Sequence, residues 1–102
     1  MTSRTAGGRP NRRKTRIVSS SGRISPDDDL LLVLSDEDIE LQAPSANGRR
    51  GLCITIKLIG GAGTVTVLPY GEQTIEGEDV AVLTDPREGF TLVSCGSLWH
   101  IV

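Results

Sequence analysis

Only a few residues of this chain have side chains that could do chemistry, and they include one histidine and two cysteines. His100 could act as a general base only beside a nucleophile or a carboxylate, and no motif in the sequence supplies one. We therefore expect His100 to point outward from the last strand. Cys53 and Cys95 do not have the spacing of metal ligands. We expect two small buried hydrophobic residues in a reducing compartment, with a disulfide as the alternative.

Three further features could suggest binding. Residues 27–29 are consecutive aspartates, but no spaced calcium loop follows them, so we expect a turn with solvated charges. Residues 60–63 (GGAG) lie between two predicted strands and are not followed by a helix. A glycine-rich phosphate-binding loop precedes a helix, so we do not expect one here. Tyr70 and Trp99 fit packing in a core or an interface better than a carbohydrate platform. The sequence therefore predicts no enzyme, no catalytic residue, no metal and no cofactor.

The net charge of -2 conceals a division of the chain into two parts. Residues 1–25 carry seven of the 11 basic residues and no acid, whereas residues 26–102 carry four basic residues and all 13 acids. We therefore expect a basic N-terminal arm over residues 1–25 and one acidic β domain over residues 26–102. The arm has too few apolar residues to fold by itself, so we expect it to be extended or disordered without a partner.

Three interpretations of the basic arm remain open: a nucleic-acid-binding tail, a solvated tail, or an anchor on an acidic protein surface. We favour the anchor and do not expect nucleic acid, because the arm has no aromatic residue for stacking on bases. In the anchor interpretation, residues 17, 18 and 24 would join a sheet. The expected partner-binding residues are Arg4, Arg9, Arg12, Arg13, Lys14, Arg16, Ile17, Val18 and Arg23.

The remainder of the chain alternates as short β-strands do. Residues 52–59 place Leu, Ile, Ile and Leu on one face, and residues 64–68 follow a glycine turn, which predicts a hairpin over residues 52–68. Residues 30–34 form an apolar run that predicts a strand buried on both faces. Residues 39–42 should turn Ile39 and Leu41 inward.

Towards the end of the chain, residues 80–83 predict another strand, and residues 90–93 should pair with residues 99–102, with Trp99 in the core. Seven or eight strands and no helical period predict an all-β fold: a small antiparallel β-sandwich or a jelly-roll-like barrel. No segment has the ~20 apolar residues that would span a bilayer, and no apolar run follows Met1 as in a secretory signal. We expect a core this small to be completed in an oligomer.

Two segments carry a resemblance to a known class of protein. The stretches GLCITIKLIGGAGTVTVLPYGEQTIEG and FTLVSCGSLWHIV resemble a β-rich module of tailed-bacteriophage virion proteins. Matching segments are residues 30–45, 51–57, 64–67, 73–77 and 92–101, so the resemblance covers most of residues 26–102. The chain departs from the pattern at Cys95, where an acid or Asn is usual, and the basic arm lies outside it.

The resemblance implies a virion surface protein, commonly a homotrimer. The chain has no coiled coil, no collagen-like repeat and no fibre shaft, which favours a capsid decoration (cement) protein that binds the major capsid protein through its arm. The alternative is a small tail fibre, spike or baseplate subunit involved in host attachment. We expect synthesis in the host cytoplasm and a final location on the outer surface of the virion.

Overall fold

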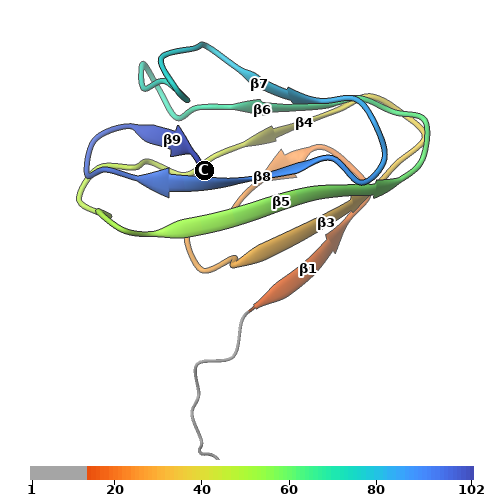
Figure 1. Ribbon diagram of the computed structural model, residues 1–102, viewed down its shortest axis with the longest axis horizontal. Coiled ribbons are helices and arrows are strands. Elements are labelled where there is room, and N and C mark those ends of the chain that lie inside the picture. Colours follow the sequence, from red (N-terminus) through yellow and green to blue (C-terminus); the bar gives the residue numbers. More distant parts are fainter. Residues whose placement is uncertain (1–13) are drawn as a thin grey trace, which may run out of the picture.

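The computed structural model describes residues 14–102, which form nine β-strands in two sheets and contain no helix (Figure 1). This confirms the predicted all-β class. The strands are β1 (Thr15–Val18), β2 (Gly22–Arg23), β3 (Leu30–Leu34), β4 (Ile39–Gln42), β5 (Cys53–Gly60), β6 (Val65–Leu68), β7 (Ala81–Leu83), β8 (Gly89–Ser94) and β9 (Trp99–Ile101). Within these residues no helix is long and apolar enough to cross a membrane.

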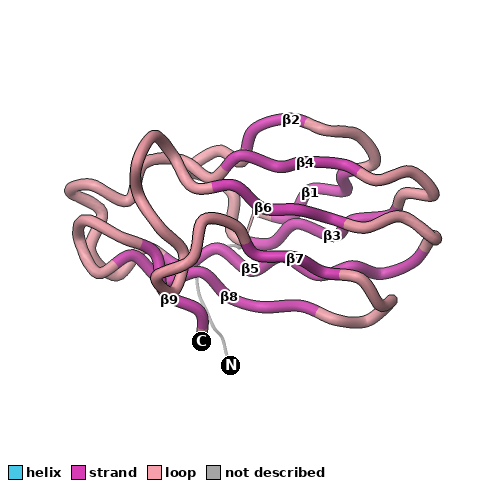
Figure 2. The backbone as a smooth tube through the Cα atoms, turned by 90° about the horizontal axis from the view of Figure 1, so that it is seen from above, coloured by secondary structure: helices cyan, strands magenta, loops and turns pink. Residues whose placement is uncertain are grey.

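From β1 to β6 the chain alternates between the two sheets, which face each other across the core (Figure 2). One sheet has the order β1-β3-β5-β8-β9 and the other has the order β2-β4-β6-β7. The pairs β1/β2, β3/β4 and β5/β6 each contribute one strand to each sheet, and we call each such pair a rung. Stacked rungs run parallel to one another, whereas β7, β8 and β9 pair antiparallel.

The strand pairing corrects the predicted antiparallel sandwich or jelly-roll barrel. Four of the seven strand pairings among residues 14–102 are parallel, and there are nine strands, not seven or eight. The alternating pattern of side chains does not distinguish parallel from antiparallel neighbours, because both arrangements place every second residue on the same face.

The predicted hairpin over residues 52–68 is wrong, because β5 and β6 lie in different sheets. The glycine stretch between them instead crosses from one sheet to the other beneath the turn of the preceding rung. A Cβ at Gly61 would lie 2.1 Å from the carbonyl oxygen of Ser35, and one at Gly63 would lie 2.0 Å from that of Glu37. The glycines therefore permit two backbones to approach closely.

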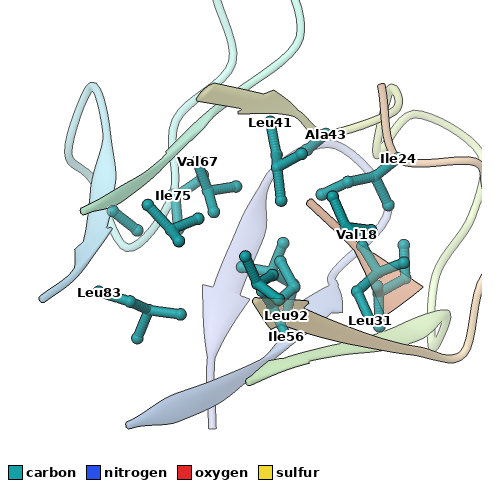
Figure 3. Close-up of a cluster of buried hydrophobic side chains, with 14 of the residues drawn as sticks. Val18, Ile24, Leu31, Leu41, Ala43, Ile56, Val67, Ile75, Leu83 and Leu92 are labelled. Carbon is teal, nitrogen blue, oxygen red and sulfur yellow. The ribbon is translucent and has the colours of Figure 1, made fainter. Parts of the chain in front are cut away.

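Both sheets contribute buried side chains to a single hydrophobic core (Figure 3). Trp99 is fully buried, as predicted, and its Nε1 donates a hydrogen bond of 3.0 Å to the carbonyl oxygen of Pro44. Ile39 and Leu41 point inward, which confirms that prediction too.

The strand over residues 30–34 is not buried on both faces as expected. Leu31 and Val33 are fully buried in the core, whereas Leu30 and Leu32 are half-buried and Leu34 is exposed. The outer side of this strand therefore remains accessible in the single chain.

The predicted boundary at residue 25 also differs from the structure. Within the expected arm, β1 pairs with β3 and β2 pairs with β4, and Val18 and Ile24 are buried in the core. Joining a sheet was the expectation for these positions in the anchor interpretation. Apolar residues too few to form a core alone suffice to extend an existing one. The first rung is thus part of the domain, and only residues 1–13 lie outside the described part.

Candidate functional site

The expected partner-binding residues fall into two groups. Arg4, Arg9, Arg12 and Arg13 lie outside the described residues. The other five belong to the first rung or precede it directly: Lys14, Arg16, Ile17, Val18 and Arg23. Their side chains do not form one surface. Val18 is buried in the core, Ile17 is exposed on the outside of the sheet, and Arg16 is paired with a buried acid.

Arg16 holds a buried carboxylate at the edge of the core. Its Nη2 lies 2.9 Å from Oδ2 of Asp28 and its Nε lies 3.3 Å from Oδ1, so the guanidinium meets the carboxylate at two points. The backbone N–H of Ser25 donates a second hydrogen bond of 2.9 Å to Oδ2. The same Nη2 also donates to the carbonyl oxygen of Arg23 at 3.2 Å, which ties β1 to the end of β2.

The register of β1 explains why an arginine can reach this position. Arg16 pairs with Leu31 and Val18 pairs with Val33, and both partners are core residues. Arg16 therefore lies on the inner face of its sheet, at the edge strand, where its side chain can reach the turn over residues 25–28.

Opposing effects act on the pKa of Asp28. Burial by itself would raise it, but the hydrogen bonds from Arg16 and from the backbone N–H of Ser25 outweigh burial, so the pKa is lowered. The hydrogen bond to Asp28 correspondingly raises the pKa of Arg16. The expected turn with solvated charges is therefore wrong for Asp28, which is completely buried and ionised.

A second contact fixes the start of β1. The backbone N–H of Lys14 donates to Oδ2 of Asp29 at 2.8 Å, and the carbonyl oxygen of Lys14 accepts hydrogen bonds from the N–H groups of Asp29 and Leu30. Together with the Arg16–Asp28 pair, these bonds fix the backbone directly after residues 1–13. We call this set of contacts the Asp28 anchor.

The outer side of the sheet formed by β1, β3, β5 and β8 carries a group of apolar side chains beside the exposed Lys57, which pairs with Leu32. Ile17 pairs with Leu32, and both point away from the core because their neighbours along each strand point inward. Ile17 is 68% exposed and Ile59 of β5 is 40% exposed on the same side. We call this surface the outer apolar face; its residues are Ile17, Leu30, Leu32, Ile59 and Val93.

Cys95, His100 and Glu76 come together around the turn between β8 and β9. Nδ1 of His100 lies 3.4 Å from Oε2 of Glu76, and the same oxygen accepts a hydrogen bond of 2.7 Å from the N–H of Ile101. His100 points outward as predicted, but the carboxylate that the sequence did not supply as a motif is close to it. Contacts between residues so far apart in the chain leave no local signal.

Both cysteines are exposed and free, so the expected burial is wrong and no disulfide joins them. The backbone N–H groups of Ser97 and Leu98 donate to the sulfur of Cys95 and lower its pKa to about 7, with smaller contributions from the side chains of His100 and Ser97. A large fraction of Cys95 is therefore the thiolate, which is the nucleophilic form, at neutral pH.

Residues 14–102 contain no group of three or more His, Cys, Asp or Glu side chains that could hold a metal ion. The fold thus brings together a buried carboxylate paired with a partly exposed arginine, a group of outward apolar side chains and one thiol with a lowered pKa. In comparisons with protein-family models, with curated proteins and with solved structures, nothing matches this chain.

Proposed function

We propose that this chain is a structural virion protein of a tailed bacteriophage that decorates the outer surface of the capsid. The resemblance of residues 26–102 to virion β modules motivates the proposal, and the Asp28 anchor supports it most directly. The anchor fixes residue 14 to the edge of an acidic domain, directly after a segment with four arginines and no acid. A basic segment that leaves a rigid domain at a fixed point is suited to binding an acidic protein surface.

In this proposal the two parts have separate roles. Residues 14–102 carry 13 acids against seven Lys and Arg, so they give an acidic body outside the shell. Arg4, Arg9, Arg12 and Arg13 would contact the major capsid protein. The outer apolar face would contact other copies of the chain in a homotrimer, since exposed apolar surfaces of this kind commonly mark interfaces.

Because β1 and β2 pair with strands of the domain, a deletion that tests the basic segment should end at residue 13. A deletion of residues 1–13 should leave the domain folded, whereas a deletion through residue 23 would also remove β1, β2 and Arg16. We expect the 1–13 deletion to keep the fluorescence of buried Trp99 and to lose binding to purified heads that lack the protein. Equal binding by the deletion variant and the full chain would overturn the proposal.

Two substitution variants separate charge from length. Replacing the four arginines by glutamine should weaken binding to heads, and replacing them by lysine should retain most of it. Binding of the lysine variant should decrease as salt rises, as binding of the parent does, because it depends on charge. Antibody labelling of virions tests the location. Label confined to the tail would overturn decoration and favour the alternative, a small tail fibre, spike or baseplate subunit.

A further inference from the structure

We propose that a groove at the carboxyl ends of β2, β4 and β6 binds an extended peptide of mixed charge, with an acidic residue held between Arg23 and Arg49. The groove has a volume of about 600 Å³, within the range of small-ligand sites. The inference does not depend on the proposed function. The side chains used in the argument are Arg23, Gln42, Arg49 and Tyr70.

The parallel stacking of the rungs creates this groove. Because β2, β4 and β6 run in the same direction, their carboxyl ends lie at one end of the sheet. Arg23 pairs with Gln42, and Gln42 pairs with Leu68, so these three residues form one row across the strands. The row lies on the outer face, since the preceding residues of β4 and β6, Leu41 and Val67, are buried in the core.

Arg23 and Arg49 are cations without a compensating acid at this groove. No Asp or Glu lines it, although the described residues contain 13 acids. Arg49 is held in place by a hydrogen bond of 3.1 Å from its Nη1 to the carbonyl oxygen of Ser45. Within residues 14–102, neither the remaining donors of Arg49 nor the guanidinium of Arg23 has a protein acceptor.

These groups fit a carboxylate on a side chain. A guanidinium presents a planar fork of donors that matches a carboxylate at two points. Tyr70 is 53% exposed at the same groove and offers a rigid apolar ring for a neighbouring residue of the ligand. The uncharged amide of Gln42 also lines the groove, where it can bond to the peptide backbone.

The acidic residues on the neighbouring surface that includes Gln42 indicate that the bound peptide carries both an acidic and a basic residue. A second groove of about 610 Å³ shares Gln42 with the first, and Glu72 and Asp79 line it. A polyanion such as a nucleic acid would be attracted at one groove and repelled at the next. An extended peptide whose acidic residue is followed by a basic residue complements both. Residues 1–13 do not fit, because they contain no acid to place between Arg23 and Arg49.

The experiment uses the full chain and labelled peptides of about ten residues with one Glu and one Lys at varied spacing, measured by fluorescence anisotropy at low salt. We expect one spacing to bind best, and Arg23→Gln or Arg49→Gln to weaken that binding by about tenfold, as for loss of a charged hydrogen bond. Arg87→Gln removes an exposed cation away from this groove and should leave binding unchanged.

Charge exchange gives a second readout. Arg23→Glu should bind a peptide with Lys in place of Glu better than the original peptide, which a merely structural role of Arg23 would not produce. Tighter binding of poly-glutamate or of a single-stranded oligonucleotide than of any mixed peptide would overturn the proposal. So would equal losses in Arg87→Gln and Arg23→Gln, or no binding of any peptide by the folded chain.

Discussion

Arg16 and Asp28 form a two-point contact in which an arginine whose side chain is 43% exposed neutralises an aspartate whose side chain is 1% exposed. The contact joins the first strand of the described chain to the turn before the third. One partner is hydrated and the other is not, so removing the two partners should have different consequences.

Arg16→Ala should destabilise the domain, because it leaves a buried carboxylate with only the N–H of Ser25 as a donor. We expect a loss of about 2 kcal/mol, below the ~3–5 kcal/mol of a fully buried pair because Arg16 is partly hydrated. Urea unfolding followed by Trp99 fluorescence measures it. Arg23→Ala, which removes an exposed cation nearby, should change stability by less than ~0.5 kcal/mol. Equal effects of the two variants would contradict the anchor.

Asp28 should give the domain an acid-sensitive component of stability. Its pKa is lowered in the folded state, so its contribution is complete above the unfolded value of about 3.9 and is lost as the pH falls through that value towards the lower folded one. Asp28→Asn should therefore be less stable at pH 7 and should lose less stability than the parent between pH 5 and pH 2, roughly the range in which this carboxyl titrates. Parallel pH profiles for the two proteins would show that another group is responsible.

Gly63 should not tolerate a methyl group. Gly63→Ala would place a Cβ 2.0 Å from the carbonyl oxygen of Glu37, so the crossing segment or the turn above it must move. We expect a loss of about 2–4 kcal/mol in thermal or urea unfolding. Gly22→Ala is the matched control, because nothing lies within 4 Å of its Cβ position and its φ is ordinary. A similar stability of the two variants would mean that the close approach does not exist in solution.

Cys95 should react with iodoacetamide at neutral pH. In a Cys53→Ser background, where Cys95 is the only thiol, we expect the alkylation rate to rise with pH and to reach half its maximum near pH 7, because its pKa is lowered to about 7. His100→Ala removes one of the smaller contributions and should move this midpoint upward. A midpoint at the ordinary thiol value of about 8.5 would contradict the arrangement at this turn.

The strands were the predictable part of this fold. The alternation in residues 52–59 and the burial of Trp99 follow from side-chain pattern alone, and both are present. Pairing was not predictable to the same extent. A glycine turn between two strands normally predicts a hairpin, yet residues 60–63 are glycine-rich because Ser35 and Glu37 lie against them. This contact joins positions distant in the sequence, so no local pattern reveals it.

The candidate sites, too, depend on contacts between distant residues that no local sequence pattern reveals. A basic, glycine- and serine-rich stretch is typical of a tail, but Val18 and Ile24 need only a core made by other strands to become buried. The burial of Asp28 depends on Arg16 lying on the inner face of β1, which follows from a parallel register that the sequence does not specify. The lowered pKa of Cys95 likewise depends on the N–H groups of Ser97 and Leu98, whose position is set by the geometry of the turn.

The stacking of rungs also sets an order of events during translation. β1 pairs only with β3 and β2 only with β4, so the first rung has no partner strand until residues 30–42 have left the ribosome. One edge of β5 then stays unpaired until β8 has been made. Trp99 completes the core: its backbone N–H donates to the carbonyl oxygen of Thr74, and its indole N–H donates to that of Pro44. β5 is thus the strand whose second edge stays unpaired longest, and the nascent chain must avoid misassociation at that edge until β8 emerges.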